Sequence, residues 1–173
     1  MSQRSIGRAA DEVDVLVDAW RRERPDLDVA PLEVLSRVSR LARHLDLARR
    51  EAFAAHDLEP WEFDVLAALR REGEPYTLSP GRLLQVTLVT SGTMTNRIDR
   101  LEAKGLVARV PDPHDGRGVQ VVLTTDGRAR VDAGLTDLLA HEREILSALP
   151  ASDRDLLADL LRRLTLPFDN AAD

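Results

Sequence analysis

Polar side chains of several kinds alternate with apolar ones in residues 91–104. Met94, Ile98 and Leu101 recur at helical spacing, which predicts a helix with one face against a core. The opposite face carries hydroxyl, amide and basic groups, the kinds that bind base edges and phosphates in the DNA major groove. These residues are Thr93, Asn96, Arg97, Arg100 and Lys104. The stretch therefore predicts a recognition helix.

The neighbouring segments complete a winged helix-turn-helix. Ser79 and Pro80 predict the start of a preceding helix, and the recognition helix should run from about Thr90–Ser91 to Lys104–Gly105. Residues 106–110 and 119–123 alternate like two strands around a loop of turn residues. In that loop Arg117 can enter a minor groove with Asp115 as its brace. The alternative is a surface hairpin with a solvated Arg–Asp pair.

The segment TMTNRIDRLEAKGLVARVPDPHDGRGVQVVLTTDG resembles the recognition helix and wing of MarR-family transcription regulators. The resemblance includes the RLEAKGLV junction, the Asp115-x-Arg117 pair and the LT..G entry to the next helix. It implies a symmetric dimer that binds DNA and is released by a ligand. The expected base and phosphate contacts are Ser91, Thr93, Thr95, Asn96, Arg100, Lys104, His114, Asp115 and Arg117.

The chain also resembles the urate-responsive branch of that family, which carries a Trp, an Asp and two Arg in corresponding elements. The resemblance implies a ligand site made of Trp20, Asp64, Arg97 and Arg109. An aromatic face, two guanidinium groups and a carboxylate suit a flat anionic heterocycle such as urate, a related purine or a carboxylate. A ligand that draws Arg97 away would shift the recognition helix and lower operator affinity.

Each of these four residues has a structural alternative. Trp20 can be an aromatic of a dimer core, and Asp64 can pair with a neighbouring arginine. Arg97 can bind a phosphate or pair with Asp64, and Arg109 can contact the DNA backbone from the wing. His44 lies beside the apolar stripe of a helix predicted to form the dimer. If it met the same histidine of the partner subunit, protonation would make the two repel, and DNA binding would depend on pH. The alternative is a solvated or hydrogen-bonded histidine.

The charge distribution and the missing residue types limit the classes of function that the chain can have. The net charge is −6, but residues 79–118 carry +2 and the remainder −8, so basic charge is concentrated on the proposed DNA face. The absence of cysteine excludes disulfides, thiolate zinc sites and thiol-based sensing. There is no metal-ligand spacing of histidines, no signal peptide and no transmembrane run, so we expect a cytoplasmic protein with no metal, no cofactor and no membrane partner.

The remaining chain is predicted to be helical, so the fold class is mainly α with a small β-wing, with dimerisation helices at both ends. We divide it into residues 1–56 (an extra helix and a dimerisation helix), 57–124 (the DNA-binding domain) and 125–173 (dimerisation helices). The last helix should begin at a Ser152 cap and end at Pro167.

The sequence therefore predicts a homodimeric repressor that binds a pseudo-palindromic operator on double-stranded DNA and responds to a small anion. One alternative is a constitutive or architectural DNA-binding protein without a ligand. A protein-interaction module that has lost DNA binding is another. An enzyme is disfavoured, since the chain has no nucleophile motif, no phosphate loop and no carboxylate pair with a nearby histidine.

Overall fold

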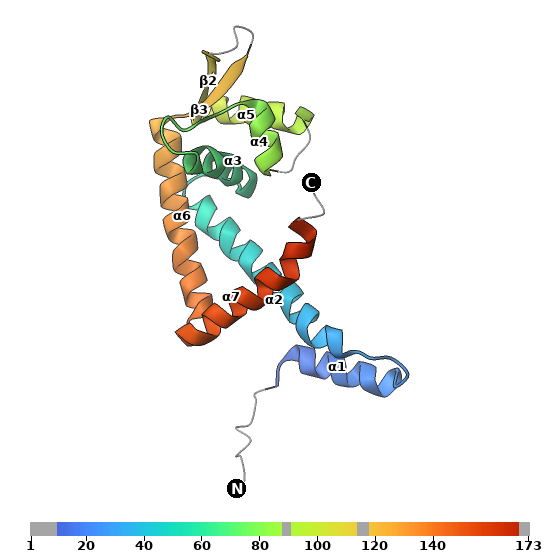
Figure 1. Cartoon of the computed structure of the whole chain (residues 1–173). Coiled ribbons are helices and arrows are strands. Elements are labelled where there is room, and N and C mark those ends of the chain that lie inside the picture. The colour runs from blue at the N-terminus through green and yellow to red at the C-terminus, as the bar shows by residue number, and fades with distance from the viewer. Residues whose placement is uncertain (1–9, 88–90, 114–117, 170–173) are drawn as a thin grey trace. The chain divides into compact units, whose positions relative to one another are not determined.

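The computed structural model describes residues 10–87, 91–113 and 118–169. The chain forms two compact units, Met1–Leu47 and Ala48–Asp173. The described elements, most of which are labelled in Figure 1, are mostly helical and confirm the predicted fold class. They are α1 (Glu12–Glu23), α2 (Ala30–Ala54), α3 (Pro60–Arg71), β1 (Thr77–Leu78), α4 (Pro80–Thr87), α5 (Ser91–Ala103), β2 (Val107–Pro111), β3 (Val119–Leu123), α6 (Thr125–Leu146) and α7 (Ala151–Asp169).

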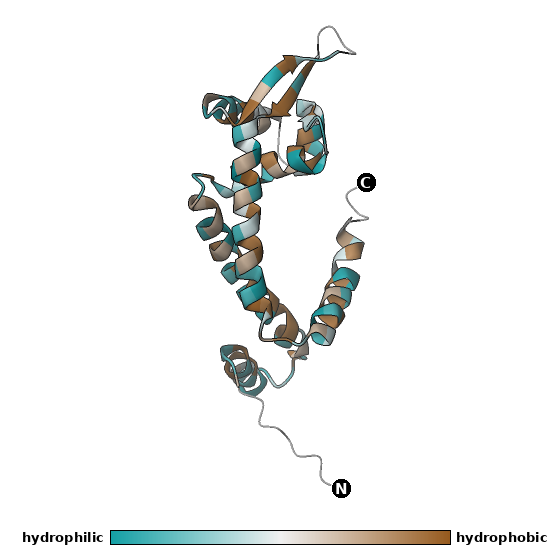
Figure 2. Cartoon of the chain, turned by 90° about the vertical axis from the view of Figure 1, so that its left-hand side faces the viewer, coloured by the Kyte–Doolittle hydropathy of each residue, from teal (hydrophilic) through white to brown (hydrophobic). Residues whose placement is uncertain are grey.

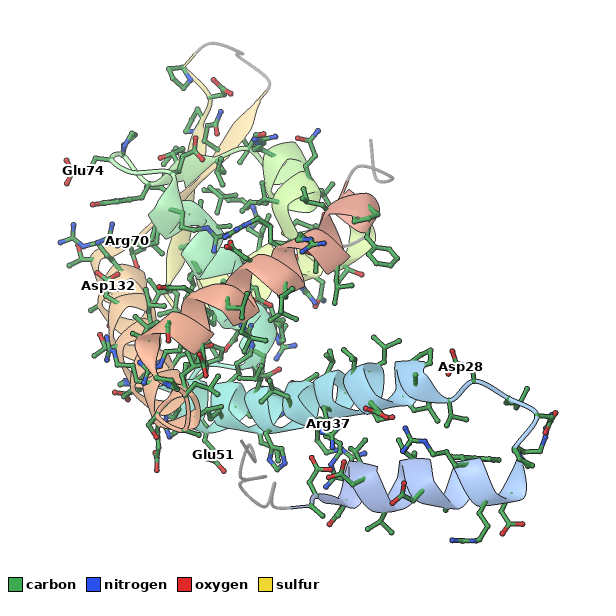
Figure 3. All side chains as sticks on the ribbon, turned by 60° about the horizontal axis from the view of Figure 1, so that its bottom comes forward. Asp28, Arg37, Glu51, Arg70, Glu74 and Asp132 are labelled. Atoms are coloured by element: carbon green, nitrogen blue, oxygen red, sulfur yellow. The ribbon has the colours of Figure 1, made fainter. Side chains whose placement is uncertain are left out.

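The first unit joins α1 to most of α2. Asp11 caps α1, because its Oδ1 accepts hydrogen bonds from the backbone N–H groups of Val13 (2.8 Å) and Asp14 (3.1 Å). Arg37, labelled in Figure 3, extends from α2 toward α1. Its Nε lies 2.8 Å from Asp11 Oδ2, and its Nη2 lies 2.7 Å from Asp14 Oδ1. The Arg37 hydrogen bond lowers the pKa of Asp11 to about 2. Charged contacts therefore join the two helices beside a small core.

The second unit holds the main core, which contains most of α3 and one face of α5. Met94, Ile98 and Leu101 are at most 1 % exposed, so the face of α5 predicted to be apolar does lie in the core. The rings of Phe53 and Phe63 stack with centroids 3.9 Å apart, which packs the end of α2 against α3. This core holds α5 in place and leaves its opposite side for solvent.

The wing is part of a three-stranded antiparallel sheet with the order β1-β3-β2. The sequence predicted two strands and missed β1, whose two residues pair with Val121 and Val122 of β3. Two residues are too few to show an alternation of apolar and polar side chains, so the sequence does not reveal this strand. It is recognised only by its pairing with β3. In Figure 1, β2 and β3 extend beyond the helices of this unit as a hairpin.

The junction of α5, β2 and α6 explains the LT..G motif. Thr124 caps α6 by accepting the Gly127 N–H (3.0 Å), and its hydroxyl donates to the carbonyls of Gly105 (2.8 Å) and Leu106 (3.0 Å). A Cβ on Gly127 would lie 2.1 Å from the Leu106 carbonyl oxygen, so only glycine fits there. Gly105 has φ +72°, which ends the recognition helix in the left-handed region.

The C-terminal helix differs from the prediction at both ends. α7 begins at Ala151, so Ser152 lies inside the helix, and it continues through Pro167 to Asp169. A proline this close to the end of a helix removes one backbone N–H, and the helix continues for only two residues beyond it. Leu156, Leu160 and Leu164 recur on one side of α7 and are between 44 % and 58 % exposed. Figure 2 shows apolar segments, coloured brown, along this helix. None of the described helices is long and apolar enough to cross a membrane.

Candidate nucleic-acid interface

α5 presents a row of exposed polar side chains. Thr93, Thr95, Asn96 and Arg100 are exposed, while Met94, Ile98 and Leu101 between them are buried. Ser91 is the first residue of the helix. The alternation leaves hydroxyl, amide and guanidinium groups on one accessible face, as a major-groove contact requires.

The wing strands run to the base of the loop in regular antiparallel register. Pro111 is opposite Val119, and the Asp112 N–H donates to the Gly118 carbonyl at 2.9 Å. The side chain of Gln120 adds a hydrogen bond to Asp112 Oδ2 at 2.5 Å. The predicted wing contacts His114, Asp115 and Arg117 lie outside the described residues.

Lys104, another predicted DNA contact, is bound to the first turn of α3. Its Nζ lies 2.9 Å from Glu62 Oε2 and 3.3 Å from the Asp57 carbonyl oxygen. Glu62 is 0 % exposed, and the same Oε2 also accepts the Glu59 N–H at 2.9 Å. The ammonium group of Lys104 thus compensates a buried charge.

Two further basic residues of α5 also contact α3. The guanidinium carbons of Arg97 and Arg100 lie 5.3 Å and 4.8 Å from the ring centroid of Trp61. Glu59 Oε1 is 3.2 Å from Arg100 Nη2, and Glu59 Oε2 accepts the Trp61 Nε1–H at 2.6 Å.

The sequence analysis did not identify Trp61 or Glu59 as neighbours of the recognition helix. The available signal was the spacing of Arg97, Arg100 and Lys104, which share one stripe of a helix and so face a common neighbour. The identity of that neighbour comes from the fold.

Arg109, predicted as a ligand residue, joins the wing to the recognition helix. Its Nη2 lies 2.5 Å from Asp99 Oδ1, and its Nη1 is paired with the carboxylate of Glu102. Its backbone N–H donates to Glu102 Oε1 at 3.0 Å. The hydrogen bond to Asp99, followed by that to Glu102, raises the pKa of Arg109. A ligand anion at Arg109 has to compete with two carboxylates.

The other predicted ligand residues have separate surroundings. Asp64 Oδ1 is 2.8 Å from Arg49 Nη2. This ion pair agrees with the structural alternative given above for Asp64, pairing with a neighbouring arginine. Arg97 lies on Trp61, and Trp20 is a 48 % exposed residue of the first unit. Within the second unit, the contacts of the described residues do not bring Asp64, Arg97 and Arg109 together. The described residues contain no group of three or more side chains suited to hold a metal ion.

Comparisons with known proteins agree on one family. The MarR family profile matches residues 56–118. The transcriptional regulator PecS of Dickeya dadantii is 39 % identical over 153 residues, which cover 88 % of this chain and 92 % of PecS.

Two solved structures share the fold. A variant of MarR from E. coli in complex with operator DNA is 31 % identical, with a TM-score of 0.64, covering 79 % of this chain and 94 % of that one. BpsR of Bordetella bronchiseptica, whose DNA binding is regulated by 6-hydroxynicotinic acid, is 28 % identical with a TM-score of 0.63, covering 76 % and 92 %. With its exposed recognition helix, its wing and this similarity along most of its length, the chain belongs to the MarR family of DNA-binding transcription regulators and is not an enzyme.

Proposed function

We propose that the protein is a homodimeric repressor that binds a pseudo-palindromic operator through α5 and the wing. The observation that carries this proposal is the exposed polar row of α5 above a buried apolar face. The operator complex of the related E. coli MarR variant supports it. The proposed DNA contacts are Ser91, Thr93, Thr95, Asn96, Arg100, Lys104, His114, Asp115 and Arg117.

Lys104 contributes less to DNA binding than the other proposed residues of this set. Its ammonium group already binds Glu62, and 33 % of its side chain is exposed. We therefore assign it an electrostatic contribution to the DNA face, with the hydrogen bonds to bases made by the exposed residues nearer the start of α5.

Exposed apolar side chains of the described helices support the proposed homodimer. In α7 these are Leu156, Leu160 and Leu164, and in α2 they are Val34, Val38 and Leu41, which are between 39 % and 54 % exposed. A symmetric dimer places two recognition helices in successive major grooves, so the half-sites should be about one helical turn apart.

A small anion such as urate is proposed to release the protein from DNA. Regulation of the related BpsR by 6-hydroxynicotinic acid, a flat aromatic acid, supports this class of ligand. The proposed anchors in the second unit are Asp64, Arg97 and Arg109; Trp20, in the first unit, remains a prediction from the sequence resemblance. Arg97 is the central residue of this proposal, because its described contact is the aromatic ring of Trp61. A charge-assisted hydrogen bond to an anion is stronger than this cation–π contact and can replace it.

The test begins with selection of duplexes from a random-sequence pool at low salt. We expect an enriched sequence with two inverted half-sites. Urate is then titrated into a gel shift with the enriched duplex, using wild-type protein, Arg97→Gln and the matched control Arg162→Gln. The control removes the same charge from the side of α7 opposite Leu156 and Leu160. Release of the wild type and the control, with a large loss of urate sensitivity in Arg97→Gln, is the expected result.

Two outcomes oppose the proposal. Enrichment without release by millimolar urate would favour a constitutive DNA-binding protein over a urate-responsive one. Failure to enrich any sequence would remove the operator-binding function itself.

A further inference from the structure

The start of α3 and the basic side of α5 form a cluster of three residues, Glu59, Trp61 and Arg100. One oxygen of the Glu59 carboxylate accepts the Trp61 indole N–H at 2.6 Å, and the other lies 3.2 Å from Arg100 Nη2. The Arg100 guanidinium carbon is 4.8 Å from the centroid of the indole ring. Both groups that hold Arg100 come from one helical turn and are fixed to each other by a hydrogen bond.

Arg100 is held in this cluster without being enclosed. Its side chain is 52 % exposed, and the described ion pair uses Nη2. Among the described residues, Nε and Nη1 of Arg100 make no hydrogen bond, so their N–H groups are free of Glu59 and can be offered to another acceptor. Guanine offers the O6 and N7 acceptors in the major groove, which an arginine binds through two donors.

Resting on the DNA-binding function proposed above, we propose that Glu59 and Trp61 are positioning residues that hold Arg100 for a base contact. They would thereby increase the preference of the protein for its operator over other DNA. A side chain that is already ordered loses less conformational entropy when it binds a base. A carboxylate next to the guanidinium also weakens its attraction to phosphates, which dominate binding to non-specific DNA.

The test compares Glu59→Gln with wild-type protein on two duplexes, the sequence enriched by selection and a shuffled duplex of the same composition. We expect affinity for the enriched duplex to fall about threefold to tenfold, the range for one immobilised flexible side chain. Affinity for the shuffled duplex should stay constant or rise. The slope of log affinity against log salt concentration for this duplex should become steeper by about one. Glu51→Gln, the same chemical change at an exposed site on α2, is the matched control for charge.

A double-mutant cycle identifies the route of the effect. If Glu59 acts through Arg100, Glu59→Gln should change neither affinity when Arg100 is already alanine. Trp61→Phe provides a second variant, because it keeps an aromatic face and removes the N–H that fixes Glu59. It should lower the operator preference by less than Glu59→Gln, with the thermal unfolding midpoint recorded for every variant.

The inference is overturned if Glu59→Gln changes the operator preference by less than twofold in a folded protein. An equal change in the Arg100→Ala background would overturn it too. If selection enriches no sequence, the operator-binding function fails by itself. In that case the salt dependence of binding to a random-sequence duplex tests the inference. If Glu59→Gln leaves the slope of log affinity against log salt concentration unchanged, the result counts against the inference. If Glu59→Gln makes that slope steeper, the result supports the restraint of Arg100 by Glu59.

Discussion

At the residue scale, the buried carboxylate of Glu62 links the recognition helix to α3. Its Oε2 accepts hydrogen bonds from Lys104 Nζ and the Glu59 N–H, whereas among the described residues Oε1 has no hydrogen-bond partner. A buried charge with one satisfied oxygen depends strongly on its counter-ion. The position of α5 against α3 is therefore sensitive to Lys104.

We predict that Lys104→Met destabilises the protein by about 2 to 3 kcal/mol, because it leaves the Glu62 charge buried without its cation. The estimate lies below the usual range of about 3 to 5 kcal/mol for a buried pair, because a third of the Lys104 side chain is exposed to solvent. Urea unfolding measures the change. The double variant Glu62→Gln, Lys104→Met removes both charges and should recover most of the loss; equal stability of the single and double variants would contradict this account.

At the element scale, α1 is held to α2 by carboxylates whose pKa values are lowered. The pKa of Asp11 falls from 3.8 to about 2, chiefly through its hydrogen bond from Arg37, and that of Asp14 is lowered through the Asp11 backbone and Arg37. A lowered pKa means that folding favours the charged form. The stabilisation is fully present above pH 4, about the ordinary pKa, and is lost as pH falls through about 2.

Arg37→Gln should therefore raise the pKa of Asp11 toward its ordinary value and remove the acid sensitivity of the α1–α2 contact between about pH 4 and pH 2. An NMR titration of the side-chain carboxyl carbons measures this directly. Asp26, whose pKa is lowered by Arg24, is the internal control and should not respond. An Asp11 pKa still near 2 in the variant would show that the α1 cap, and not Arg37, sets it.

The wing provides the second element-scale prediction. Arg117→Ala should weaken binding to all duplexes by a similar factor and lower the logarithmic salt dependence by about one, because a minor-groove arginine responds to potential more than to sequence. Binding measurements over a range of salt concentrations check this, with Arg162→Ala on the opposite side of α7 from Leu160 as the control for charge. Unchanged affinity and salt dependence would contradict the proposed role of the wing.

At the scale of the whole molecule, the proposed dimer predicts the effect of a charge on α7. Leu160→Glu should shift the protein toward monomer, because a carboxylate in an apolar interface loses its hydration without a partner. It should also weaken operator binding, since a monomer spans one half-site. Sedimentation equilibrium and the gel shift measure the two effects. Ala158→Glu, on the opposite side of the helix, should leave the dimer intact; a dimeric Leu160→Glu protein would place the interface elsewhere.

Local sequence determined much of the molecule. The Ser79 cap marks the start of α4 as predicted, and Gly105 follows the recognition helix. The periodicity of Met94, Ile98 and Leu101 identified the buried face of α5. These features depend on interactions within a few residues or on helical geometry, so they can be read from the chain itself.

Only the tertiary structure decided which distant groups meet. Periodicity placed Arg97 and Arg100 on one side of α5, but the packing of α3 brought Trp61 and Glu59 to them. The same limit applies to β1, to the Asp64–Arg49 pair and to the carboxylates of α5 that bind Arg109. Helical and strand spacing specifies the direction of a side chain relative to its own element; its neighbour across the core depends on how the elements pack.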